Sequence, residues 1–184
     1  MTKTTSRKAG ENSLDYRRNI TELTTILKRE IRSFNTIVEL LVLEGKALVE
    51  CDNNLLMQVI EREEDVLTSI ACLEKSRMEV VRKIAAHSKE NPETLTVTEI
   101  AETVEGPLKN ELVETAHVLN EINADIQQRK LSNNLLIKQG IMVIESNIRS
   151  ILKAAGKENL IKNIYSAGAE YGRVSGSIRI DGRL

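Results

Sequence analysis

The side chains best suited to chemistry are two histidines and two cysteines, and their spacing matches no familiar catalytic or metal-binding motif. His87 precedes an expected linker and His117 lies inside an expected helix, with no further ligand at helical spacing. Cys51 and Cys72 fit neither a CxxC pair nor a Cys/His pattern, and we interpret them as reduced thiols on helices of a cytoplasmic protein. The sequence has no GxxxxGK[ST] or GxGxxG loop to cradle phosphate. We therefore expect no enzyme, no metal site and no cofactor.

His117 leaves one chemical alternative open, because an exposed histidine on a helical bundle can carry a phosphoryl group. Its neighbours, Thr-Ala-His-Val-Leu-Asn, lack the lysine and glycine expected around such a residue. The carboxylates mostly alternate with bases along the expected helix faces, which indicates a solvated surface. Phosphotransfer is therefore kept as a third hypothesis, behind the two given below.

The composition favours a few long helices over a sheet protein. The 184 residues suit one domain, and the 41% that are hydrophobic can form a core. There are only two prolines, no tryptophan, three tyrosines and one phenylalanine. Sheets depend on aromatic and β-branched residues and on many Gly/Pro turns, so a sandwich, a barrel or an alternating α/β enzyme is not expected.

Charge and hydropathy exclude two classes of partner. The 26 basic and 27 acidic residues give a net charge of −1, which draws the protein neither to nucleic acid nor to an anionic membrane surface. No apolar run approaches the roughly 20 residues that span a bilayer. The first residues also lack the apolar stretch of a signal peptide, so we expect a cytoplasmic protein with no membrane insertion.

The hydrophobic pattern predicts an all-α fold: an antiparallel bundle of three long helices with a short extra helix and a mobile C-terminal tail. Apolar residues recur in steps of three, four or seven, which is the period of helices packed in a bundle. After a disordered segment at 1–12, the expected helices cover residues 13–50, 53–86, 96–105 and 107–155.

Local signals set the connections between these helices. Asp52 or Asn53 would cap the second helix by accepting a backbone N–H. Residues 96–99, Thr-Val-Thr-Glu, match a capping box at the start of the short helix. Gly106 would end that helix, and Pro107 suits the first turn of the next.

Polar residues interrupt the apolar face of two long helices. Glu63 and Arg77 fall on this face in the second helix, where they either fix the register or extend their stems to the bundle edge. In the third long helix the pattern changes phase after Asn133-Asn134, which indicates a change of supercoil or of the partner that the helix faces. This helix is also the longest, so its end either projects beyond the bundle or packs on something else. Beyond the phase change its apolar positions are Ile137, Ile141, Ile144, Ile148 and Ile151.

Residues 156–184 differ from the rest of the chain. They hold five of the nine glycines and two of the three tyrosines, and we expect a mobile tail that begins with a short amphipathic helix. Aromatic residues are costly to leave in water and are favoured as interface anchors, so the tail is the candidate binding segment. The alternative is that Tyr165 folds back onto the end of the preceding helix. The candidate partner-binding residues are Leu160, Ile161, Ile164, Tyr165, Tyr171 and Val174.

The order of these features resembles the FlgN family of flagellar export chaperones. Residues 41–52 are similar to the family pattern L-x-x-E-x-x-A-L followed by D, and a later stretch is similar to L-x-x-L-x-x-x-R. Asn133-Asn134-Leu135-Leu136 resembles the family's N-x-x-L-L without its spacing, and the segment from Tyr165 to Gly176 resembles its Tyr/Gly-containing tail. The resemblance spans about residues 14–176. The matching positions are Leu41, Glu44, Ala47, Leu48, Asp52, Ile70, Leu73 and Arg77.

The resemblance implies a cytosolic chaperone that has no enzymatic activity. Such a protein would bind the C-terminal helical segments of flagellar hook-associated proteins, which form the hook–filament junction, and would prevent their premature assembly. It would deliver them to the type III export apparatus and contact export gate and ATPase components, with Tyr165 or Tyr171 as the tyrosine at such contacts. A homodimer is compatible with this function. The second hypothesis is a structural coiled-coil scaffold that associates with itself.

Overall fold

The computed structural model describes residues 3–88 and 90–157, and for residues 3–13 it describes only the helical backbone. Within these ranges the chain is all-α, as the sequence predicted. The four helices are α1 (Lys3–Glu50), α2 (Asn53–Ser88), α3 (Val97–Glu102) and α4 (Pro107–Ala154).

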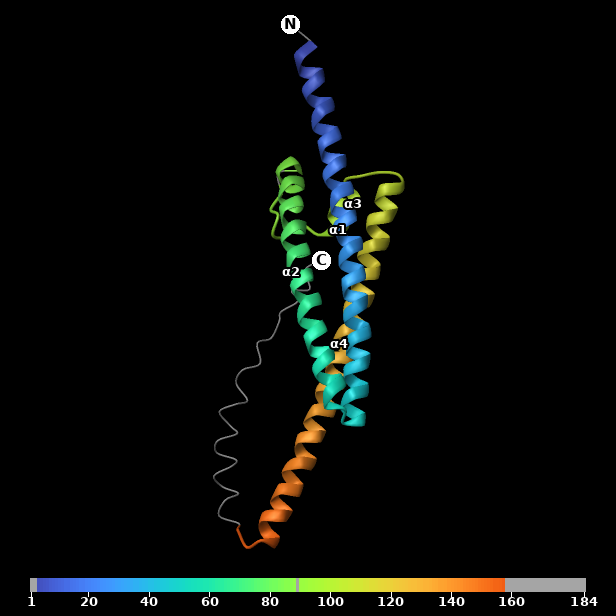
Figure 1. The fold of residues 1–184 in the computed structure, drawn as a ribbon. Coiled ribbons are helices and arrows are strands. Elements are labelled where there is room, and N and C mark those ends of the chain that lie inside the picture. Colours follow the sequence, from blue (N-terminus) through green and yellow to red (C-terminus); the bar gives the residue numbers. More distant parts are fainter. Residues whose placement is uncertain (1–2, 89, 158–184) are drawn as a thin grey trace.

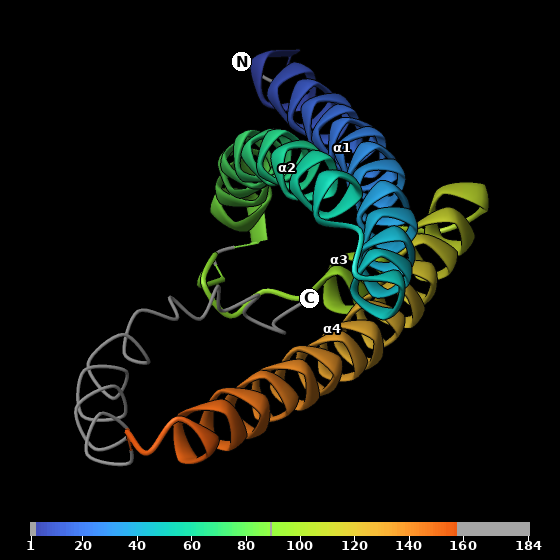
Figure 2. The same ribbon diagram turned by 60° about the horizontal axis from the view of Figure 1, so that its bottom comes forward.

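Helix α1 is the centre of the arrangement (Figure 1). It packs against α2 and against α4, α3 packs against α4, and α2 runs antiparallel to the other two long helices. Among the described residues, no Cα atom of α2 lies within 8 Å of a Cα atom of α4. Figure 2 shows the result, with α2 and α4 diverging from α1 on different sides. The long helices therefore have the expected antiparallel order but form an open arrangement around α1.

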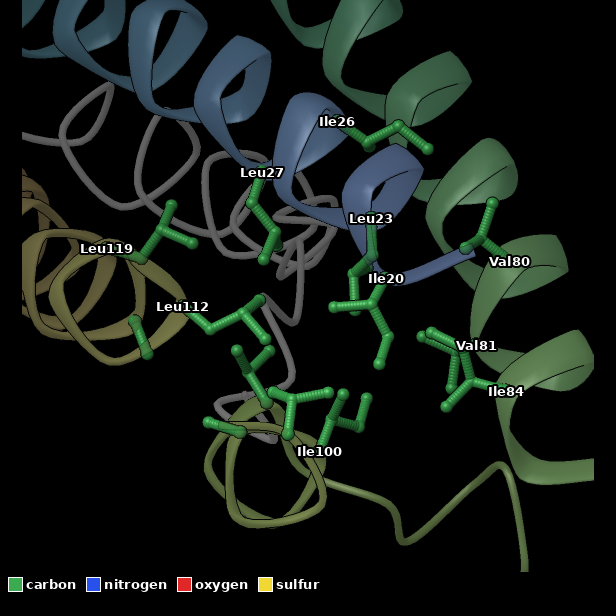
Figure 3. Close-up of a cluster of buried hydrophobic side chains, with 14 of the residues drawn as sticks. Ile20, Leu23, Ile26, Leu27, Val80, Val81, Ile84, Ile100, Leu112 and Leu119 are labelled. Carbon is green, nitrogen blue, oxygen red and sulfur yellow. The ribbon is translucent and has the colours of Figure 1, made fainter. Parts of the chain in front are cut away.

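The main core lies where α3 fills the space between the diverging helices. Figure 3 shows Ile20 and Leu23 of α1 in the middle of this cluster, with side chains of α2 on one side and of α4 on the other. Ile100 of α3 contributes from below and is only 1% exposed. The labelled members also include Ile26, Leu27, Val80, Val81, Ile84, Leu112 and Leu119.

Tyr16 ties three elements together at the same end of the molecule. Its hydroxyl oxygen lies 2.7 Å from Thr103 Oγ1, directly after α3. Its ring meets the ring of His87 edge-on, with 5.6 Å between the centroids. An edge-to-face aromatic contact of this kind stabilises packing modestly, so His87 is accounted for as a structural residue.

A second, smaller cluster lies towards the turn between α1 and α2. Ile37, Leu41 and Ile126 are buried there, and they join the C-terminal half of α1 to the middle of α4. Partly buried residues of α2 pack on the same cluster, among them Leu67 and Ile70. Side chains of α2 and of α4 thus pack on the same cluster of α1 side chains, although the backbones of α2 and α4 stay apart.

The helix ends follow the local signals in the sequence. Helix α1 ends with Cys51 at φ 54°, and the Asp52 N–H donates to the Ala47 carbonyl at 2.9 Å, which is a Schellman ending. Asp52 also caps α2, because its Oδ1 accepts from the Leu55 N–H at 3.0 Å. The capping box of Thr96 and Glu99 is present at α3.

Other boundaries differ from the sequence-based expectation. Helix α1 begins at Lys3, so residues 3–12 are helical in this structure where a disordered segment was expected. Extending an existing helix by one residue fixes few dihedral angles for each hydrogen bond gained, so polar residues can continue a helix that a core has nucleated. Helix α3 covers only Val97–Glu102, because the C-cap residue Thr103 bonds back to Ile100 and Ala101. Helix α4 begins at Pro107 as expected.

Candidate partner-binding surface

The C-terminal part of α4 extends past the turn between α1 and α2 (Figure 1). Asn133 is the last buried residue of this helix, and no residue of the described chain after it is buried. About 20 residues of α4 therefore leave the core as a single helix. At about 1.5 Å per residue, this projection is about 30 Å long.

The projecting helix carries a continuous row of exposed isoleucines, which we call the isoleucine stripe. Spacings of four and three residues place all five on one face of the helix. Single exposed apolar residues are ordinary on protein surfaces, but a contiguous apolar face usually marks an interaction site. The exposed fractions are 37% for Ile137, 50% for Ile141, 59% for Ile144, 38% for Ile148 and 67% for Ile151.

The isoleucine stripe continues the face of α4 that packs on α1. Steps of four, three and four residues lead from Ile126 through Lys130 and Asn133 to Ile137, so these positions share one face. Ile126 and Asn133 are buried. The phase change expected after Asn133 is therefore not a change of face: polar residues occupy two positions of a single row. The row becomes exposed because α1 ends, and the direction that it faces on α4 stays the same.

Asn133 fastens α4 to the end of α1. Its Nδ2 donates to the Leu41 carbonyl at 2.8 Å and to Glu44 Oε2 at 2.6 Å. Gly45 faces the same amide, and a Cβ atom at this glycine would lie 2.8 Å from Asn133 Oδ1. Glycine is therefore what lets the two helices approach here.

Glu63 of α2 adds a titratable group beside this contact. Burial, and then the nearby Glu44 carboxylate, raise the pKa of Glu63 to about 7, while Lys130 acts in the opposite direction. Its Oε1 atom is buried with no hydrogen-bond partner, and the side chain lines a cavity of about 50 Å³ together with Lys130. Glu44, Glu63, Lys130 and Asn133 thus form a polar node at the point where α4 leaves the core.

An open groove of about 390 Å³ lies beside the polar node, between the end of α1 and α4. Val42, Val49 and Leu136 contribute apolar side chains to its lining, and Lys46 and Arg129 contribute positive charge. Val42 and Val49 are 48% and 68% exposed, and the sequence analysis did not single them out. Both valines lie beside the apolar face of an otherwise amphipathic helix, and apolar residues outside that face were the signal that could have identified them.

The six residues expected to bind a partner all lie outside the described residues. They are Leu160, Ile161, Ile164, Tyr165, Tyr171 and Val174.

Of the other candidates, His117 is exposed and its Nδ1 lies 3.4 Å from Glu121 Oε2. Cys51 and Cys72 are exposed free thiols. Within residues 3–88 and 90–157, no group of His, Cys, Asp and Glu side chains is placed to hold a metal ion. None of the helices in this part of the chain is long and apolar enough to cross a membrane.

The fold and this surface define a class: an all-α protein in which α4, which is as long as α1, presents an exposed apolar face. The FlgN protein family matches residues 19–172, and the chain belongs to this family. FlgN proteins form a family of flagellar export chaperones that bind hook-associated proteins. The matched range contains the isoleucine stripe and all of the expected binding residues except Val174. Comparisons with curated proteins and with solved structures gave no match.

Proposed function

We propose that this chain is a cytoplasmic export chaperone for a hook-associated protein. It binds a C-terminal helical segment of that client, prevents its premature assembly and delivers it to the flagellar type III export apparatus. Membership of the FlgN family supports the general role. The observation that carries the proposal for this particular chain is the exposed isoleucine stripe on α4.

The stripe has the dimensions of a helix-binding site. From Ile137 to Ile151 it extends for 14 residues, or about 21 Å, which is about four turns of a client helix. Burying one aliphatic side chain contributes about 1.5–3 kcal/mol. Five isoleucines can thus offset part of the entropy lost when client and chaperone associate. A short amphipathic helix is only marginally stable alone in water, and an apolar face of matching period stabilises it.

The tail contributes to the same contact in this proposal. Its expected binding residues follow α4 directly, since the helix ends with Gly156 at φ 66° and Leu160 comes four residues later. Leu160, Ile161, Ile164 and Tyr165 would extend the apolar surface, and Val174 would lie near its far end. Tyr165 or Tyr171 would contact the export gate or ATPase components.

A binding experiment with a matched pair of variants tests this function. The full-length chain would be titrated with a C-terminal helical peptide of a hook-associated protein. Ile144→Glu places a charge in the middle of the stripe, whereas Ser146→Glu places the same charge on the opposite, exposed face of α4. We expect at least a tenfold loss of affinity for Ile144→Glu and an affinity within twofold of the parent for Ser146→Glu. Equal binding by the two variants would remove the stripe from the client site.

The second candidate function is a self-associating coiled-coil scaffold. The same observation favours it, because five isoleucines in steps of four and three also form a coiled-coil seam. Light scattering of the parent and of Ile144→Glu distinguishes the two functions. A tight dimer that Ile144→Glu dissociates, together with no binding of the client peptide, would favour the scaffold. A dimer that leaves client binding intact is compatible with a chaperone.

A further inference from the structure

We propose that residues 158–171 of this chain fold back as an antiparallel helix and cover the isoleucine stripe from Ile141 to Ile151 when no client is bound, so that tail and client compete for one face. This inference rests on the proposed function and adds a form of regulation to it. Three observations carry it: the exposed stripe, the ending of α4, and the spacing of apolar residues after that ending.

The end of α4 has the geometry that begins a short loop between helices. The Lys157 N–H donates to the Leu152 carbonyl at 2.9 Å, and the Gly156 N–H donates to the Lys153 carbonyl at 3.1 Å. Gly156 lies at φ 66°, in the left-handed region that glycine favours. This Schellman ending closes the helix, and loops of two to five residues commonly join antiparallel helices. A second helix can therefore start at about residue 158.

The residues after this turn repeat the spacing of the stripe in the reverse direction. If the chain reverses at Gly156, a residue n positions after it lies beside the residue n positions before it. The apolar tail positions then advance in steps of three and four that match the stripe in the opposite direction. The resulting pairs are Ile161 with Ile151, Ile164 with Ile148, Gly168 with Ile144, and Tyr171 with Ile141.

The tether favours the tail over a second copy as the occupant of the stripe. The chain continues for 27 residues beyond Lys157, from 158 to 184, and the first 14 of them suffice to cover four of the five isoleucines, from Ile151 to Ile141. A segment held by a short loop has an effective concentration in the millimolar range, well above that of a second molecule at ordinary protein concentrations. Even weak docking of the tail therefore covers the isoleucines without a dimer.

The composition of the tail favours weak docking, so that a client can displace it. Gly168 and Gly172 fall within or beside the proposed helix, and each glycine costs a helix about 1 kcal/mol relative to alanine. Gly168 also leaves Ile144 without a side chain opposite it. A client helix with apolar residues throughout would bury more surface, release the tail, and free its tyrosines for other contacts.

Disulfide trapping in the full chain tests this inference without needing a client. In a background of Cys51→Ser and Cys72→Ser, Ile148→Cys is combined with Ile164→Cys, which the register places side by side. The control combines Ser146→Cys, on the opposite face of α4, with the same Ile164→Cys. A disulfide requires Cα atoms about 4.4–6.8 Å apart, so its rate of formation reports docking. We expect the first pair to form an intramolecular disulfide at least tenfold faster than the control.

Two results would overturn the inference. Equal rates for the two pairs would show that the tail does not dock on the stripe, and disulfides formed only between molecules would assign the stripe to a second copy. A second pair, Ile141→Cys with Tyr171→Cys, checks that the whole segment follows the register. Adding the client peptide should slow trapping at least fivefold. Trapping that is fast with and without peptide would keep the docked tail but remove the client from this face, so the two proposals fail separately.

Discussion

Asn133 of α4 lies against Gly45 of α1, and a methyl group at position 45 would come within 2.8 Å of the Asn133 Oδ1 atom. The same amide donates to the Leu41 carbonyl and to Glu44, so it cannot move away without losing hydrogen bonds. This contact is the last buried point before α4 projects into solvent. It therefore fixes the direction in which the isoleucine stripe leaves the core.

Gly45→Ala should destabilise the protein, although alanine is the better helix former. The substitution gains about 1 kcal/mol of helix propensity but displaces an amide that makes one buried and one partly buried hydrogen bond, each contributing about 1 kcal/mol or more. We expect a net loss of about 1–2 kcal/mol, measured as the free energy of unfolding in urea. Gly140→Ala is the control: nothing lies within 4 Å of a Cβ atom there, so it should stabilise the protein by about 0.5–1 kcal/mol.

A rescue experiment separates steric conflict from other effects at this contact. If the clash is with Asn133, adding Asn133→Ala to Gly45→Ala should cost less than the sum of the two single changes. Strict additivity would mean that the Asn133 side chain is not what Gly45 accommodates.

Arg77→Met should destabilise the contact between α1 and α2 by about 3 kcal/mol. Arg77 Nε lies 3.2 Å from Oε1 of Glu30, whose side chain is only 4% exposed, so the substitution leaves a buried carboxylate unpaired. Burial already raises the pKa of Glu30 above its usual value despite the attraction of Arg77. Replacing both partners, with Glu30→Leu and Arg77→Met, should restore most of the lost free energy of unfolding. A double variant no more stable than Arg77→Met would contradict this account.

Glu63 should make the stability of the protein fall as pH rises towards 7. Its pKa in the folded state is about 7, above the usual 4.5, so the folded state holds this proton more tightly than the unfolded state does. The penalty therefore grows between about pH 4.5 and 7 and is constant above that range. Glu63→Gln should raise the free energy of unfolding at pH 8 by about 1 kcal/mol, a value reduced for the partial exposure of the side chain. Its advantage should shrink towards pH 5, and a gain that is the same at both pH values would argue against titration of Glu63.

Cys51→Gly should stabilise the turn between α1 and α2. Cys51 adopts φ 54°, a left-handed conformation that costs a residue with a Cβ atom about 1 kcal/mol and costs glycine almost nothing. The side chain is exposed, so little packing is lost. We expect a gain of about 0.5–1 kcal/mol in thermal or urea unfolding, with Cys51→Ala as the control that keeps the strain. If both variants had the same stability, backbone strain at this position would be negligible.

Several local features were correctly predicted from the sequence because neighbouring residues determine them. The capping box at Thr96 and the start of α4 at Pro107 depend on hydrogen bonds and dihedral preferences within one turn. The period of the apolar residues likewise identified the long helices and the five isoleucines, because a helix places every third or fourth residue on one face. The sequence showed that Glu63 and Arg77 are polar residues on an apolar face, but it did not show which residues surround or pair with them.

The pairings and the openness of the fold were decided only in three dimensions. Glu30 and Arg77 are 47 residues apart in the chain, and Leu41 and Asn133 are 92 apart, so their contacts depend on how whole helices cross. The apparent change of phase in α4 is one continuous face with Lys130 and Asn133 set into it, which a list of apolar positions does not reveal. By itself, the sequence determined which residues share a face of each helix, since that follows from local backbone geometry. The tertiary structure decided where the apolar face of α4 becomes exposed, since α1 ends at Glu50 while α4 continues to Ala154.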